Sequence, residues 1–180
     1  MGTLPQRGPT RGHQRGHRRE AWAWFGSFRS RQGVATAGPE LEANVLAPRT
    51  AALCGAQHRA GGFWSLENPE TSLVWGYGPI GSLLELGADV SFDQCRYGLR
   101  TDPELNAGYV RKATRIRSNL PALQALGLRC TRDHTHQRCG GKVRTPSGWM
   151  NRSALAGRYP DALCMHWAAL VASSSGALGR

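Results

Sequence analysis

Apolar residues in the first part of the chain follow two patterns that predict different elements. From residue 38 onward they fall on one side of a helix that has Pro39 in its first turn. Pro48 lies inside this pattern and should kink or split the helix, because proline lacks the backbone N–H and clashes with the preceding turn. Residues 63–66 are a short apolar run, which predicts a buried strand that ends at the tripeptide Glu67-Asn68-Pro69.

The rest of the chain alternates between strand and helix patterns. Strands are predicted at residues 89–94 and 113–118, and helices at residues 79–86, 120–126 and 159–173. Loops are predicted at residues 97–108 and 147–157. Strands that alternate with helices predict an α/β fold with helices packed on a sheet. The residues expected in its core include Trp64, Trp75, Trp149, Trp167 and Cys164.

Composition divides the chain into three parts. Residues 1–37 are dominated by Gly, Pro, Arg, His and Gln and predict a disordered basic leader with one apolar cluster, AWAWFGSF. Residues 38–173 carry the periodic patterns and predict one α/β domain, which is what a 180-residue chain can build around a single core. Residues 174–180 are expected to form a disordered C-terminus.

The charge is unusual for a chain of ordinary apolar content. It has 23 Lys and Arg against 12 Asp and Glu, a net charge of +11, and its two lysines are Lys112 and Lys142. The forked N–H donors of arginine match the geometry of phosphate. DNA or RNA is therefore the first partner to expect, bound weakly by electrostatic attraction. A GC-rich genome produces the same excess of Arg, Ala and Gly without selection for binding, and this alternative stays open.

The sequence carries few targeting signals. No apolar stretch is long enough to span a bilayer, so no membrane partner is expected. The basic N-terminus lacks the apolar core of a secretory signal. Five cysteines are an odd number, which favours a reducing intracellular compartment, either cytoplasm or nucleus. The sequence gives no indication of the oligomeric state.

The tripeptide Glu67-Asn68-Pro69 has two interpretations. Open α/β sheets bind ligands beyond the carboxyl ends of their parallel strands, so Glu67 at such an end could face the edge of a nucleobase. Its carboxylate can accept a hydrogen bond from an exocyclic amine. The alternative is an ordinary turn in which the proline fixes the backbone and the glutamate is solvated.

The order of motifs along the chain resembles one known family. The string FWSLENPETSLVW is followed by DVSFDQCRYGLR, RKATRIRSN, LRCTRDHTHQRCGG and AGRYPDALC. This order, over residues 38–170, resembles the DNA cytosine-C5 methyltransferase-like domains found in phages and in retroelement polyproteins of algae and other protists. The resemblance implies a partial Rossmann-like, methyltransferase-type sheet with flanking helices.

The resemblance also implies roles for residues on two strands. The glutamate that holds the target cytosine in that family corresponds to Glu67, with Asn68 beside it. A second set is expected near the same strand ends and in contact with nucleic acid: Lys112, Thr114, Arg115 and Arg117. The two arginines alternate along their strand, so both can lie on one face and approach phosphate.

Two parts that methyl transfer requires have no counterpart in the sequence. S-adenosylmethionine needs a Gly-rich loop after an apolar strand, and the Gly-rich segment before residue 38 follows no such strand, so this cofactor site is not expected. The family's Pro-Cys nucleophile is missing upstream of Glu67, and Cys54 has no preceding proline. We therefore expect a truncated methyltransferase-like fragment of retroelement origin, without catalysis of its own, that binds nucleic acid weakly.

A Cys/His-rich segment predicts a metal site. Its candidate ligands are Cys130, His134, His136 and Cys139. Sulfur and imidazole together favour Zn²⁺, which takes four ligands in a tetrahedron. Cys95 could replace Cys139 as the fourth ligand, because its Asp-Gln-Cys segment recurs in the resembled family. The alternative is a basic loop with unligated histidines.

Two further interpretations follow from this segment. Arg132 and Arg138 flank the histidines, so a loop held by zinc could lie on nucleic acid, and the chain would be a zinc-stabilised nucleic-acid-binding module. A third interpretation is a degenerate gene product without a selected function, which would melt broadly. Hydrolase and phosphate-loop chemistry have little support, because neither a Gly-x-Ser-x-Gly nor a Gly-Lys-Ser/Thr string occurs.

Overall fold

The structure is a computed structural model that describes residues 38–101 and 108–175. The leader expected at 1–37 lies outside the described residues. The α-helices are α1 (Gly38–Arg59), α2 (Gly78–Gly81), α3 (Arg152–Leu155) and α4 (Asp161–Ser175). The strands are β1 (Ser65–Pro69), β2 (Ala88–Asp93), β3 (Ala113–Ser118), β4 (Lys142–Thr145) and β5 (Gly148–Asn151). Short 3₁₀ helices cover Leu73–Gly76, Ser82–Leu86, Gln94–Tyr97 and Pro121–Leu126.

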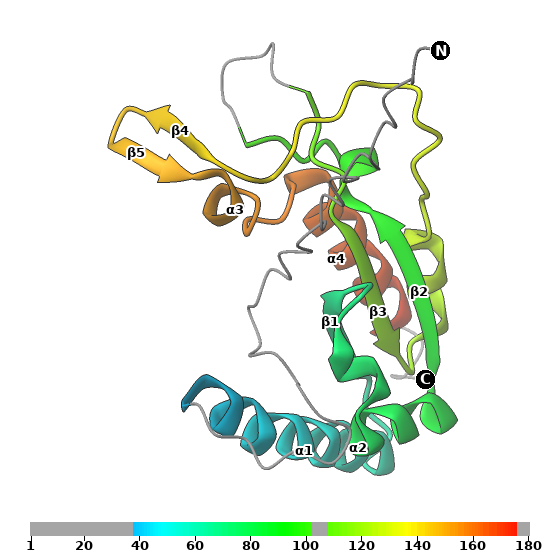
Figure 1. The fold of residues 1–180 in the computed structure, drawn as a ribbon. Coiled ribbons are helices and arrows are strands. Elements are labelled where there is room, and N and C mark those ends of the chain that lie inside the picture. The colour runs from blue at the N-terminus through cyan, green and yellow to red at the C-terminus, as the bar shows by residue number, and fades with distance from the viewer. Residues whose placement is uncertain (1–37, 102–107, 176–180) are drawn as a thin grey trace, which may run out of the picture.

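Three strands form the central sheet in the order β1-β3-β2 (Figure 1). Both outer strands pair with β3 in the antiparallel direction, so β1 and β2 run parallel to each other on either side of it. The fold is therefore mixed α/β, as expected, but the parallel sheet expected from the sequence is wrong for the described strands. A parallel neighbour requires a long crossover, usually through a helix, whereas the described part of the β2–β3 connection contains only the 3₁₀ helix Gln94–Tyr97.

Glu67, Asn68 and Pro69 lie inside strand β1 rather than in a turn after it, which corrects the expected strand at residues 63–66. A proline is tolerated here because β1 is an edge strand. The backbone N–H of Glu70 donates to the Ala113 carbonyl, and hydrogen-bonded pairs alternate along an antiparallel ladder. The Pro69 nitrogen therefore points away from β3, where no ladder bond is lost.

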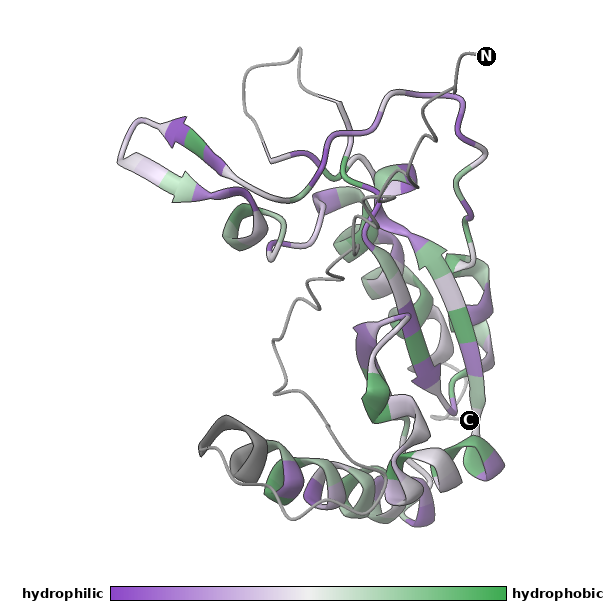
Figure 2. Cartoon of the chain, viewed as in Figure 1, coloured by the Kyte–Doolittle hydropathy of each residue, from purple (hydrophilic) through white to green (hydrophobic). Residues whose placement is uncertain are grey.

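The sheet separates two apolar cores. One lies between the sheet and helices α1 and α2 and includes the buried Trp64 and Trp75. The other contains the fully buried Phe92, Ile116 and Leu163 and is covered by α4 and the 3₁₀ helix at residues 121–126. Polar and apolar residues alternate along β2 and β3 (Figure 2), as strands with different surroundings on each face require.

Helix α1 continues through Pro48 to Arg59, so the expected split is wrong. Its buried residues Ala43, Ala47, Ala51 and Cys54 recur at helical spacing on both sides of the proline. Packing of this face against the first core offsets the hydrogen bond that Pro48 cannot donate. In the described parts of the chain, no helix is long and apolar enough to cross a membrane.

Helix α4 begins at Asp161 and runs through Ser175, beyond the boundary expected at residue 173. Leu163 is completely buried, and Trp167 and Leu170 pack partly against the second core. Cys164 was expected in the core but is exposed. The helix thus buries one face and leaves the other to solvent.

Strands β4 and β5 form a separate two-stranded hairpin that projects from the body of the molecule (Figure 1). The sequence predicted a loop at residues 147–157, where the structure has β5 and α3. The missed signal is Thr145-Pro146-Ser147-Gly148, since proline and glycine at these positions favour a tight turn. Trp149, expected in the core, is 70% exposed on this hairpin.

Candidate metal centre

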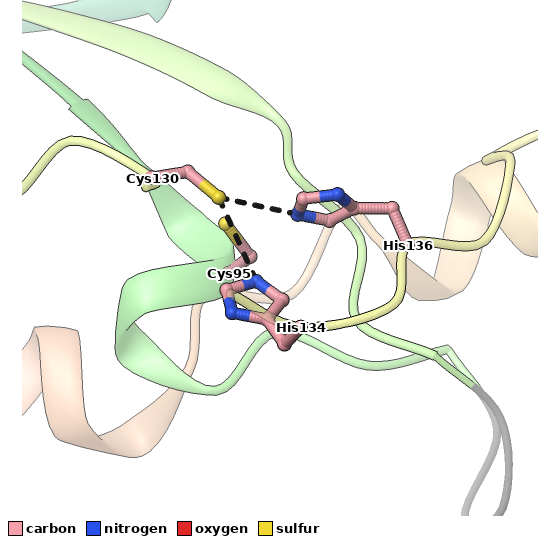
Figure 3. A group of neighbouring side chains, drawn as sticks. All are labelled: Cys95, Cys130, His134 and His136. Carbon is pink, nitrogen blue, oxygen red and sulfur yellow. Dashed lines mark hydrogen bonds between the residues drawn. The ribbon is translucent and has the colours of Figure 1, made fainter. Parts of the chain in front are cut away.

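Cys95, Cys130, His134 and His136 bring one ligand atom each into a group whose members all lie within 4.8 Å of one another (Figure 3). The Cys130 Sγ atom lies 3.7 Å from His134 Nε2 and 3.4 Å from His136 Nε2. With Zn–S and Zn–N bonds of about 2.3 and 2.0 Å, a tetrahedron places sulfur and nitrogen about 3.5 Å apart. The four side chains therefore have the spacing needed to hold a metal ion.

The sheet positions the two cysteines through Asp93, the last residue of β2. Cys95 follows two residues later in the 3₁₀ helix Gln94–Tyr97 and is buried. The Asp93 carboxylate accepts a hydrogen bond from the Cys130 backbone N–H at 2.9 Å and another from Arg111 Nε at 2.9 Å. This fully buried carboxylate thus fixes Cys130 against the strand that leads to Cys95.

Tyr109 contacts the segment that carries the two histidines, residues 134–137, which we call the histidine loop. Its backbone N–H donates to the Thr135 carbonyl, and its carbonyl accepts from the Gln137 N–H at 2.9 Å. The Tyr109 ring also meets the edge of the His134 ring at a centroid distance of 4.7 Å. Gly108 is required for this approach, because a Cβ atom there would lie 2.8 Å from the Thr135 carbonyl oxygen.

The ring orientation of His134 is set by Asp133. His134 Nδ1 lies 2.7 Å from Asp133 Oδ1, and Asp133 Oδ2 forms an ion pair with Arg96 at 3.1 Å. Hydrogen bonds from Thr131 and then from His134 lower the pKa of the Asp133 carboxyl. The ionised carboxylate therefore accepts the Nδ1 proton, which leaves Nε2 as the lone-pair donor toward the cluster.

Replacing Asp133 with asparagine is expected to lower metal affinity about 10- to 100-fold without unfolding the protein. The change removes the charge that orients His134, whereas all four ligands remain. Competition with a chromophoric zinc chelator measures the affinity. Asp161→Asn, at an exposed carboxylate on α4, is the matched control. Equal affinities for the Asp133 and Asp161 variants would contradict the positioning role.

Burial raises the pKa of the Cys95 thiol to about 12, and a hydrogen bond and charge interaction with Cys130 add to this effect. The buried Cys95 thiol thus favours the protonated form until a cation neutralises it. Cys139 lies outside the group. It packs against Leu99, Val110 and Ala156, so the structure selects Cys95 over Cys139 as the fourth ligand.

The four residues expected on β3 and just before it do not form a phosphate-binding face. Arg115 and Arg117 share one face of β3, as the alternation predicted, but that face packs on Trp75. Arg117 is 3% exposed and donates to Asp89 and to the Ile80 carbonyl. Its assignment to nucleic-acid contact is wrong, because its donors are already used inside the protein.

Thr114 and Arg115 are similarly engaged within the fold. Thr114 is fully buried, and its hydroxyl accepts a hydrogen bond from the Gln94 side chain at 2.9 Å, so its expected contact with nucleic acid is also wrong. Arg115 is half-buried and lies 3.5 Å from Asp89 Oδ2. Cross-strand pairing explains the network, because Asp89 lies directly opposite Arg117 in the β2–β3 register.

Glu67 and Lys112 come together on the opposite side of the sheet from the arginines. Glu67 lies opposite Ile116 and accepts a hydrogen bond from the Tyr159 hydroxyl, while Asn68 is buried on the arginine face. Lys112 Nζ donates to the Ala156 carbonyl at 3.1 Å and lies 5.1 Å from the Tyr159 ring centre. Burial lowers the pKa of Lys112, and burial followed by Glu67 raises the pKa of Tyr159.

Arg132 and Arg138 are exposed on the loop that carries the candidate metal ligands, and their contact with nucleic acid stays a prediction. The residues that sequence reasoning missed are those that hold the ligands in place: Asp93, Tyr109 and Asp133. Only Asp133 carried a signal, since a carboxylate next to a histidine is a common partner of a metal ligand.

Comparison of the chain with models of protein families, with curated proteins and with solved structures gives no match. The functional assignment therefore depends on the site itself.

Proposed function

We propose that the protein is a zinc-stabilised nucleic-acid-binding module. The observation that carries this proposal is the group of two sulfur and two imidazole ligand atoms, all within 4.8 Å of one another. This donor set suits Zn²⁺, and four protein ligands are typical of structural zinc rather than of catalytic zinc, which keeps one position for water. Zinc would supply a cross-link, with no chemistry of its own.

The cross-link would join segments that are far apart in the sequence. Cys95 follows the sheet strand β2, whereas Cys130, His134 and His136 belong to a long segment without regular structure. Among the described residues, the backbone–backbone hydrogen bonds of residues 129–138 are those with Tyr109. A metal would therefore order a loop that the protein core cannot order by apolar burial.

The ordered loop presents positive charge. Arg129, Arg132 and Arg138 are exposed there, and the whole chain has a net charge of +11. Arg129 also pairs with Glu70, which leaves Arg132 and Arg138 as the better candidates for phosphate contact. A fixed pair of guanidinium groups binds the phosphate backbone with little dependence on base sequence.

Purified protein is expected to hold about one equivalent of zinc, and chelation is expected to weaken its binding to a labelled oligonucleotide. Each phosphate contact that chelation removes should reduce the slope of log affinity against log salt by about 1. Zinc content by atomic absorption and anisotropy titrations at several salt concentrations test this. Zinc far below one equivalent, with unchanged ellipticity and binding after chelation, would refute the proposal.

A second candidate function is that of a methyltransferase-like fragment that keeps a base-binding carboxylate and lacks catalysis. Two observations favour it: β1 and β3 are neighbours, so Glu67 lies beside the Lys112 segment, and Glu67 Oε1 is buried without a hydrogen-bond partner. The described central sheet is antiparallel throughout, so the sheet itself gives no support for a Rossmann-like parent. Incubation with labelled S-adenosylmethionine and duplex DNA should give no methyl incorporation above background, and incorporation would overturn the inactive assignment.

A further inference from the structure

The hairpin of β4 and β5 has one polar, cationic face and one apolar face. The register pairs Lys142 with Asn151 and Arg144 with Trp149, so these four side chains lie on the same face, and all four are exposed. Val143 pairs with Met150 on the other face, and Val143 is 7% exposed. The face that holds Val143 is thus covered, whereas the opposite face exposes a tryptophan beside two cationic side chains.

Trp149 differs from the other described tryptophans. It is 70% exposed, whereas Trp64 and Trp75 are 7% and 8% exposed and Trp167 packs partly on the second core. An exposed indole ring next to Arg144 and Lys142 has the composition of a base-stacking platform, in which an aromatic face receives a base and cations hold the adjacent phosphates.

The surroundings of the hairpin favour a polyanion. Between residues 134 and 160 the sequence has no Asp or Glu, and its basic residues there are Arg138, Lys142, Arg144, Arg152 and Arg158. The hairpin also extends away from the sheet and its helices (Figure 1), so a long strand can approach it. Charge complementarity therefore selects nucleic acid over a protein or an apolar ligand.

The base of the hairpin is tied to the metal cluster. The Arg152 N–H donates to the Gly141 carbonyl at 3.0 Å, and the Arg152 guanidinium donates to the Gln137 side chain. Gln137 directly follows the ligand His136 and is bound to Tyr109 through its backbone. At the other end, the Thr145 hydroxyl donates to the Gly148 carbonyl at 2.8 Å, which fixes the turn. Hydrogen bonds thus join the base of the hairpin to the segment that carries His136 and close its turn.

We propose that the β4–β5 hairpin binds single-stranded nucleic acid, with an unpaired base stacked on Trp149 and the flanking phosphates held by Lys142 and Arg144. This inference rests on the proposed function and specifies its ligand. A base in a duplex has both faces covered by its neighbours, so an indole ring on an exposed ribbon can stack only on an unpaired base. Both RNA and DNA present such bases.

Trp149→Ala is expected to weaken binding of a single-stranded oligonucleotide about 5- to 100-fold, with the salt dependence unchanged. Trp149→Phe should keep most of the affinity, because phenylalanine also stacks. Arg144→Ala should reduce the slope of log affinity against log salt by about 1. The matched control is Met165→Ala, which removes a side chain of similar exposure from α4. Anisotropy titrations with single-stranded RNA, single-stranded DNA and duplex DNA of one sequence measure all four variants in the zinc-loaded protein.

The outcomes separate this inference from the proposed function. If the wild type binds in a zinc-dependent way and Trp149→Ala binds the single strands equally well, the hairpin assignment is wrong while the module proposal survives. If Trp149→Ala weakens duplex and single-strand binding equally, the preference for unpaired bases is wrong. If the wild type binds none of the three probes, both proposals fail. Equal zinc contents and equal melting temperatures of all variants would exclude misfolding as the cause of weaker binding.

Discussion

Cys130→Ser is expected to lower zinc affinity by more than 100-fold and to abolish stoichiometric zinc in the purified protein. The Cys130 sulfur lies within 3.7 Å of both imidazole Nε2 atoms, so its loss leaves the two histidines without their neighbouring thiolate. Removing a residue that hydrogen-bonds a metal ligand lowers metal affinity about 10- to 100-fold, and removing the ligand itself lowers it further. Chelator competition and atomic absorption measure the change.

Two other cysteines provide the controls. Cys164→Ser changes an exposed thiol on α4 and should leave zinc content at the wild-type level. Cys139→Ser tests the alternative ligand set and should also leave it unchanged, because Cys139 packs against Leu99, Val110 and Ala156 instead of facing the group. Zinc retained by Cys130→Ser but lost from Cys139→Ser would show that the metal is held elsewhere.

Asp89→Ala is expected to destabilise the fold by about 3–5 kcal/mol. Arg117 is 3% exposed, and Asp89 accepts from its Nε at 2.6 Å and its Nη2 at 2.9 Å. Without this carboxylate the guanidinium group keeps only carbonyl acceptors and stays buried without a counter-charge. Chemical denaturation monitored by circular dichroism gives the change in unfolding free energy.

Further variants distinguish the cost of leaving a buried charge unpaired from the smaller cost of losing an exposed ion pair. Glu70→Gln removes the partner of Arg129, whose side chain is 48% exposed, and should cost about 1 kcal/mol or less. The double variant Asp89→Leu/Arg117→Met should recover part of the loss, because it removes both charges together. If Asp89→Ala lowers the unfolding free energy as little as Glu70→Gln does, the Arg117 guanidinium group must become solvated in the variant.

The alternation of polar and apolar residues predicted the elements that have one face in an apolar core and the other face in different surroundings. The alternation in residues 113–118 gave β3 with its observed bounds, since Ile116 faces one core and Arg115 and Arg117 face the other side. The same alternation gives no information on strand direction. The parallel sheet was expected from the alternation of strands with helices and from the family resemblance. Direction depends on how β2 and β3 connect, which is a property of the whole chain.

The candidate metal site was predicted in part for a similar reason. Three ligands lie within seven residues of the sequence, whereas Cys95 was expected only as an alternative to Cys139. It joins them because the Asp93 carboxylate at the end of β2 accepts a hydrogen bond from the Cys130 N–H. The arginines of β3 show the opposite error. Their spacing correctly placed them on one face, but spacing does not reveal that Asp89 and Trp75 cover that face.

The proline of β1 has a consequence for self-association. An exposed sheet edge offers a row of backbone donors and acceptors to any passing strand, including one from a second copy of the same chain. Because the nitrogen of Pro69 points outward from the sheet and carries no hydrogen, that row is interrupted on the open side of β1. We therefore expect Pro69 to hinder edge-to-edge pairing of β1 with a second strand, whatever the role of the neighbouring Glu67.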